Sequence, residues 1–156
     1  MNLVKPIIKD PSLKLVKEYL NRFSIDKRYS LGDSAILKLF KSFPNNEELD
    51  HIYLKVSIIN EIYSTNLYNT FKMAEHILSL DIDDRLKNGD PSLVHAIARG
   101  HNIKVRNEEN GKDYNFYSFA TKYCSWHNQN DFAIYDSFVE KILIAYRNRS
   151  DKLNFK

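Results

Sequence analysis

An aspartate next to a predicted helix is the residue of this chain best placed to do chemistry. Residues 115–143 predict a helix, a short loop and a second helix that begins at Asp136 or Ser137. A carboxylate at a helix N-terminus is kept ionised by free backbone N–H groups and by the positive end of the helix dipole. Ser137 and Glu140 fit a capping box, which would leave Asp136 just outside the helix. Asp136 is therefore a candidate catalytic carboxylate, with helix capping as the alternative.

The helix predicted over about 115–127 carries a candidate amine. Its apolar residues recur at helical spacing and predict one buried face: Phe116, Phe119, Ala120 and Tyr123. A more polar side contains Ser118, Thr121, Lys122 and Ser125. If Lys122 reaches inward, its amine could serve as a Schiff-base nucleophile. The alternative is a solvated or ion-paired lysine.

No cofactor or metal site is expected. Cys124 and His127 have the spacing of two ligands on one helical face, but the chain has a single cysteine and its other histidines are scattered. The acidic stretch 81–90 lacks the glycine and terminal glutamate of a calcium loop, so helix capping explains it better. Phosphate-binding glycine loops and nucleophile elbows are also missing from the sequence.

Composition predicts the framework that must position these residues. The 156 residues are 43% hydrophobic and include only four glycines and four prolines, which favours helices over many short strands. We expect one compact all-α domain of seven or eight helices over residues 1–148, followed by a frayed basic tail over 149–156. Asn110-Gly111 allows one short hairpin near 103–114.

Apolar periodicity predicts which faces are buried. The first helix, after Asp10-Pro11, should bury Leu13, Val16, Leu20 and Phe23. The last helix should bury Val139, Ile142, Leu143 and Tyr146. The helix within 46–63 is apolar on two sides, the second formed by Leu54, Ile58 and Ile62, which predicts a central buried position.

Charge and cysteine content bear on partners and compartment. Net charge is +3, but residues 1–46 contain nine Lys/Arg against four Asp/Glu and residues 141–156 contain five against one. If the two ends meet in space, they form a positive face that could contact phosphates. No apolar run is long enough to span a bilayer, and one cysteine fits a reducing compartment, so we expect a cytoplasmic protein without a membrane partner.

Three features together resemble the helix-hairpin-helix DNA glycosylase superfamily over about residues 50–146. They are an apolar helix with a polar turn (HIYLKVSIINEIYSTN), a second amphipathic helix and a helix–loop–aspartate ending (FAIYDSFV). The resemblance implies that Asp136 faces the deoxyribose of a flipped nucleotide and stabilises the oxocarbenium-like sugar or positions the nucleophile. The lysine of members that also cut the backbone would fall at Ser118, and Lys122 lies one helical turn further on.

The function predicted on this basis is DNA-base recognition, as a DNA glycosylase or glycosylase/lyase acting on a damaged or unusual base. Trp126 or Tyr123 would stack on the extruded base, while His127 or Asn128 would read its polar edge. Ser118 and Tyr135 complete the predicted substrate-binding set. Alternatively Trp126 fills the core and Asn128 caps the helix. A catalytically inactive module of the same fold, binding nucleic acid or protein, is the other hypothesis.

Overall fold

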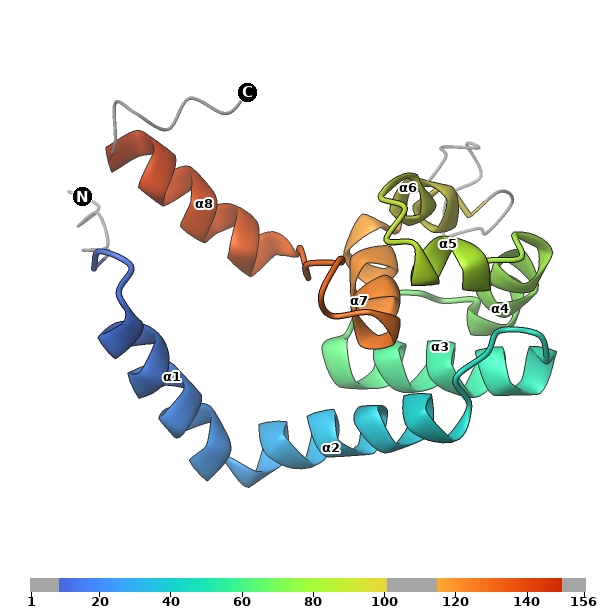
Figure 1. The fold of residues 1–156 in the computed structure, drawn as a ribbon, viewed down its shortest axis with the longest axis horizontal. Helices are drawn as coiled ribbons and strands as arrows, with labels where there is room; N and C mark the ends of the chain where they lie inside the picture. Colours follow the sequence, from blue (N-terminus) through green and yellow to red (C-terminus); the bar gives the residue numbers. More distant parts are fainter. Residues whose placement is uncertain (1–8, 101–114, 150–156) are drawn as a thin grey trace.

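The chain folds into α-helices. A computed structural model describes residues 9–100 and 115–149, and over these ranges it contains helices and no strand (Figure 1). The eight helices of the described part are α1 (Leu13–Ile25), α2 (Lys27–Ser42), α3 (Leu49–Tyr63), α4 (Thr70–Ser79), α5 (Asp83–Lys87), α6 (Ser92–Ala98), α7 (Tyr117–His127) and α8 (Ser137–Arg149). The all-α prediction is confirmed. The possible hairpin near 103–114 and residues 150–156 of the predicted tail lie outside the described residues.

Short polar side chains start several of these helices. The Ser12 hydroxyl accepts a hydrogen bond from the Leu15 N–H at 3.2 Å at the start of α1, and Asn69 Oδ1 accepts one from the Lys72 N–H at 3.0 Å at the start of α4. Both are N-caps that satisfy backbone donors left free at a helix end. Local sequence therefore determines where these helices begin.

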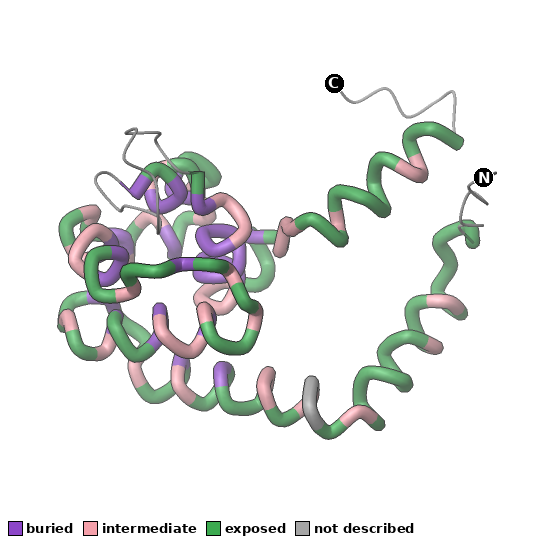
Figure 2. Tube along the Cα trace, turned by 180° about the vertical axis from the view of Figure 1, so that it is seen from behind, coloured by how far each residue is buried: buried purple, intermediate pink, exposed green. Residues whose placement is uncertain are grey.

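The core lies among α2 to α7, which we call the body. Helix α3 packs against α4, α2 and α7, and α6 packs against α7. Figure 2 shows buried positions gathered in this part of the molecule. The fully buried apolar side chains include Ile36, Ile52, Val56, Ile59, Met73, Ile77, Leu93, Ile97 and Tyr123. The helix that carries Lys122 is therefore fixed in a well-packed setting.

Helices α1 and α8 form a separate arm. They come from opposite ends of the chain, extend away from the body and approach each other toward the chain ends (Figure 1). The Tyr146 hydroxyl donates to the Lys9 carbonyl at 2.7 Å, and Arg149 Nη1 lies 3.2 Å from Asp10 Oδ1. Residues from the two basic ends of the chain are therefore in contact in the described structure.

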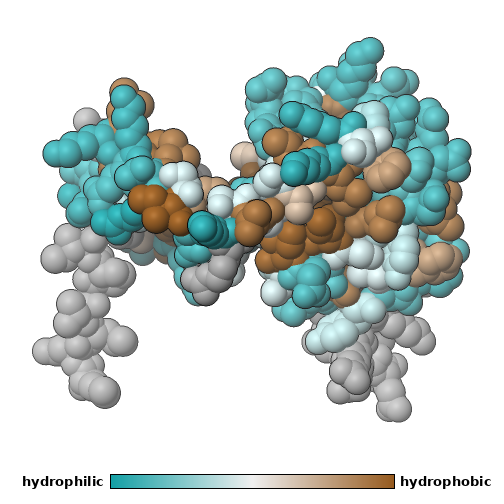
Figure 3. All heavy atoms as spheres, turned by 90° about the horizontal axis from the view of Figure 1, so that it is seen from below, coloured by the Kyte–Doolittle hydropathy of each residue, from teal (hydrophilic) through white to brown (hydrophobic). Residues whose placement is uncertain are grey.

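The predicted burial of three apolar faces is wrong. Neither α1 nor α8 contains a buried residue, and Leu20 and Ile142 are 61% and 51% exposed. On α3, the second stripe is also open at both ends, with Leu54 and Ile62 exposed. Figure 3 shows apolar surface on one face of the body and a smaller apolar area on the arm. The periodicity identified the apolar faces correctly, but the described elements of the chain leave large parts of them exposed.

Within the described ranges, every helix is too short or too polar to cross a bilayer.

Candidate functional site

Lys122 and Asp136 form an ion pair where α7 and α8 meet. Lys122 lies in the middle of α7, and Asp136 directly precedes α8. Lys122 Nζ is 3.2 Å from Asp136 Oδ2, and the two side chains are 3% and 24% exposed. The pair is thus buried on the lysine side and open to solvent on the aspartate side. An amine and a carboxylate that were candidates on sequence grounds are in direct contact.

Asp136 is also the N-cap of α8. Its Oδ1 atom accepts hydrogen bonds from the N–H groups of Phe138 at 3.0 Å and Val139 at 3.1 Å, while Oδ2 pairs with Lys122. The prediction that Ser137 caps this helix and leaves Asp136 outside is therefore wrong. Partial burial raises the pKa of Asp136, but hydrogen bonds from Val139 and Lys122 outweigh it and place this pKa below its ordinary value. The carboxylate is ionised at neutral pH.

Ser118 completes the immediate surroundings of the lysine. Lys122 Nζ donates to Ser118 Oγ at 2.8 Å, and the two residues are one turn apart on α7. The Tyr63 ring of α3 lies 5.4 Å from the same nitrogen, within the range of a cation–π interaction. The structure therefore brings together three of the predicted residues, which are Ser118, Lys122 and Asp136.

A hydrogen-bonded chain continues from this site into α2. Trp126 Nε1 donates to the Tyr63 hydroxyl at 3.2 Å, and that hydroxyl donates to Asp33 Oδ1 at 3.3 Å. Burial and then the charge of Asp33 raise the pKa of Tyr63 to about 12, and burial raises the pKa of Asp33. Sequence reasoning missed Tyr63 and Asp33, because their hydrogen bond joins residues 30 positions apart and no local pattern indicates it.

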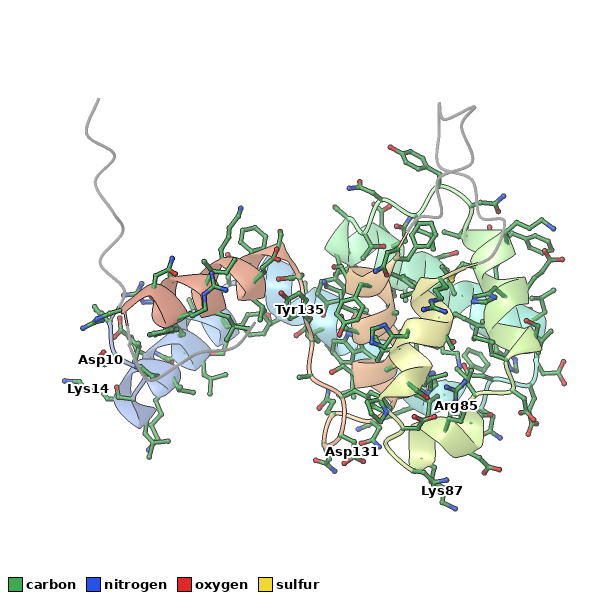
Figure 4. All side chains as sticks on the ribbon, turned by 90° about the horizontal axis from the view of Figure 1, so that it is seen from above. Asp10, Lys14, Arg85, Lys87, Asp131 and Tyr135 are labelled. Carbon is green, nitrogen blue, oxygen red and sulfur yellow. The ribbon has the colours of Figure 1, made fainter. Side chains whose placement is uncertain are left out.

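Thr121 fixes the segment that leads into α8. Its hydroxyl donates to the Tyr135 carbonyl at 2.9 Å and accepts from the Tyr135 N–H at 3.2 Å. The Tyr135 ring packs edge-on against Tyr117, with ring centres 5.7 Å apart. Figure 4 shows Tyr135 at the junction of body and arm. This two-way bond sets the position of Asp136, the next residue in the chain.

Tyr123 and His127 belong to a second polar cluster, inside the core. The fully buried Tyr123 donates from its hydroxyl to Asn46 Oδ1 at 2.6 Å. His127 Nε2 lies 3.5 Å from Lys55 Nζ, and its ring packs on Phe40 with centres 4.7 Å apart. Tyr123, predicted to stack on the base, and His127, predicted to read its polar edge, are therefore occupied in the packing of α7 on α2 and α3.

Lys55 is the centre of this second cluster. It is fully buried, and its Nζ atom donates to the carbonyls of Phe43 and Asn45 at 3.1 and 2.9 Å and to Asn46 Oδ1 at 2.7 Å. Burial lowers its pKa to about 8, and the nearby Asp83 carboxylate opposes that shift. Burial, together with the charge of Lys55, lowers the pKa of His127 to about 3. Because all donors of this lysine have acceptors, it ties the α2–α3 loop to the core.

Asn128 ends α7 and shapes the loop that follows. Its backbone N–H bonds to the Cys124 carbonyl, and its side-chain nitrogen donates to the Leu86 carbonyl at 3.0 Å and to Asp131 Oδ2 at 2.7 Å. The side chain thus makes the loop contacts of a capping residue. Cys124 is buried, and no group of three or more potential metal ligands occurs among the residues described.

The family model HI_0787_N, described as an N-terminal domain, matches residues 15–131. The chain belongs to this family. An uncharacterized protein of Haemophilus influenzae is similar to it, with 45% identity over 100 residues, which are 64% of this chain and 46% of that protein. The chain thus spans about half the length of this curated relative. No solved structure matches significantly.

The boundaries of the HI_0787_N match divide the candidate site. Ser118 and Lys122 lie inside the matched residues, whereas Asp136 and the whole of α8 follow the last matched position, Asp131. The ion pair thus joins the matched region to the helix that comes next.

Proposed function

We propose that this domain recognises bases in DNA and cleaves the N-glycosidic bond of a damaged or unusual base. The observation that carries the proposal is the contact between Lys122 Nζ and Asp136 Oδ2 at 3.2 Å, at a helix N-terminus that opens to solvent. An amine beside an ionised carboxylate is the pair of groups that glycosylase/lyase chemistry needs. The helix-hairpin-helix resemblance assigns the same role to Asp136.

Asp136 would act on the sugar. As the base departs, positive charge develops at C1′ and the ring oxygen of the deoxyribose. A carboxylate whose pKa is lowered by its hydrogen bonds stays ionised at neutral pH and can stabilise that charge. Because it is the more exposed member of the pair, Asp136 is the group that a flipped nucleotide would meet first.

Lys122 would provide the lyase step. The Lys122 ammonium would pass one proton to Asp136 Oδ2, 3.2 Å away, and the free amine would add to C1′ while the N-glycosidic bond breaks. The electron pair of that bond leaves with the departing base, which takes the proton from Asp136. A second proton then moves from the attached nitrogen to the ring oxygen as the bond between C1′ and that oxygen breaks, which gives a protonated Schiff base. Ser118 Oγ, 2.8 Å from the nitrogen, would orient the amine. Trp126 is hydrogen-bonded to Tyr63, whose ring contacts Lys122, and Tyr135 directly precedes Asp136 in the chain. Both residues would contact the base.

A binding module without chemistry is the second candidate, and one observation favours it. The Lys122 side chain is 3% exposed and its amine is already bonded to Ser118 and Asp136. In that function, the ion pair fixes α8 on α7, and the basic residues of the arm contact phosphates. DNA affinity would then fall steeply with salt, while no bond is broken.

The test is incubation of the protein with oligonucleotides that contain modified bases or abasic sites, followed by alkaline cleavage. Asp136→Asn should abolish base release, and Lys122→Ala should abolish borohydride trapping on abasic DNA. Lys87→Ala is the matched control, because Lys87 is an exposed lysine at the end of α5, outside the arm, and its loss should leave trapping unchanged. If Asp136→Asn leaves every activity of the wild-type protein intact, the enzyme hypothesis is wrong.

A further inference from the structure

The arm contains an apolar groove. It has a volume of about 740 Å³ and is lined mainly by α1, with Tyr146 contributed by α8. Its apolar lining from α1 includes Leu15, Val16, Leu20 and Phe23. Val16, Leu20 and Phe23 belong to the face that helical spacing predicted would be buried, and all three are exposed in the described structure.

An arm of this composition is characteristic of a helix pair that lacks a partner. Neither α1 nor α8 has a buried residue, whereas α3, α4, α6 and α7 each contribute several to the core. Large apolar side chains gathered on one face, rather than scattered singly, mark a contact surface. On α8 the exposed large apolar side chains are Phe138, Ile142, Leu143 and Ile144, which lie outside the groove, and the last three are consecutive and so spread around the helix.

The relatives indicate what covers this surface. The matching family model is that of an N-terminal domain, and more than half of the Haemophilus influenzae relative lies outside its match with this chain. In such a protein further polypeptide follows the matched region. The match to this chain ends at Asp131, and α8 begins at Ser137, so α8 leads directly out of the N-terminal domain.

We infer that the α1–α8 groove binds an amphipathic helix from the polypeptide that follows this N-terminal domain in longer relatives. A helix laid along α1 and against Tyr146 would place its apolar residues on Val16, Leu20 and Phe23. Such a helix would remove the apolar face of α1 from water. This inference does not depend on the proposed DNA chemistry.

The probe for this inference is a set of overlapping synthetic peptides that cover the residues of the Haemophilus influenzae relative beyond the C-terminal end of its match. Binding to the full chain is followed by fluorescence anisotropy. At least one peptide should bind. Leu20→Asp should weaken that binding by about tenfold or more, because it places an unpaired charge in an apolar contact.

Leu54→Asp is the matched control, because Leu54 is a comparably exposed leucine on α3, outside the groove. It should leave peptide binding unchanged. Both positions are exposed, so both variants should keep the helical circular dichroism of the wild type. The inference is overturned if no peptide binds, or if both variants weaken binding equally. It is also overturned if sedimentation shows a dimer that Leu20→Asp dissociates, because the occupant would then be a second copy of the chain.

Discussion

The His127 imidazole should make the stability of this protein sensitive to acid. Burial and the charge of Lys55, 3.5 Å away, lower the pKa of His127 from 6.5 to about 3. Because the folded pKa is the lower one, acid protonates the unfolded chain first, and stability falls as the pH drops below about 6.5. Between pH 7 and pH 4 this difference removes about 3 kcal/mol of the free energy of unfolding.

Urea unfolding of the wild type and of His127→Gln at both pH values isolates this effect. The variant cannot take up the proton, so it should lose about 3 kcal/mol less than the wild type between the two pH values, which is roughly 1–3 M in urea midpoint. Carboxylates such as Asp136 titrate in both proteins and cancel in the comparison. Equal losses in the two proteins would show that His127 is not held neutral by its surroundings.

Three further predictions concern stability and reactivity. Asn46→Ala removes a buried acceptor shared by Lys55 and the Tyr123 hydroxyl, so urea unfolding should show a free energy of unfolding lower by about 3 kcal/mol. The control Asn45→Ala changes an exposed side chain and should lower it by less than about 0.5 kcal/mol. Gly89→Ala should lower the melting temperature, because Gly89 has φ +62° and an added Cβ would lie 2.8 Å from the Asp131 Cβ. An unchanged melting temperature would contradict this and would mean that the loop moves to make room for the methyl group. Cys124, whose pKa is raised to about 12 by burial, should react with a thiol reagent only in denaturant, and rapid native labelling would contradict its burial.

The sequence predicted the helices and identified Lys122 and Asp136 as candidate site residues from local patterns, but it did not predict the contact between the two side chains. Helical periodicity and the short loop between α7 and α8 are local patterns, and they place Lys122 on the polar side of one helix close to the first residue of the next. The Lys55 cluster could not be predicted in this way. Asn46, Lys55 and Asp83 are brought together by tertiary packing, and none of them is unusual in its local sequence.

Burial of the arm was mispredicted for a different reason. An apolar stripe such as Leu13, Val16, Leu20 and Phe23 shows that a face is suited to burial, but it contains no information about which element covers it. Tyr146 and Arg149 of α8 contact Lys9 and Asp10, which precede α1, and most of the α1 stripe stays exposed. A pattern within one helix cannot distinguish a partner in the same domain from one elsewhere.

The two hydrogen bonds between the Thr121 hydroxyl and the Tyr135 backbone fix the N-terminal end of α8, so any rotation of this helix would pivot about that end. With 13 residues, α8 is about 20 Å long, so a swing of about 10° would move its far end by about 3 Å. The same rotation would move the Asp136 carboxylate, which lies beside the pivot, by less than about 1 Å. The C-terminal end of α8 can therefore adjust to a bound partner while the Lys122–Asp136 ion pair keeps its geometry.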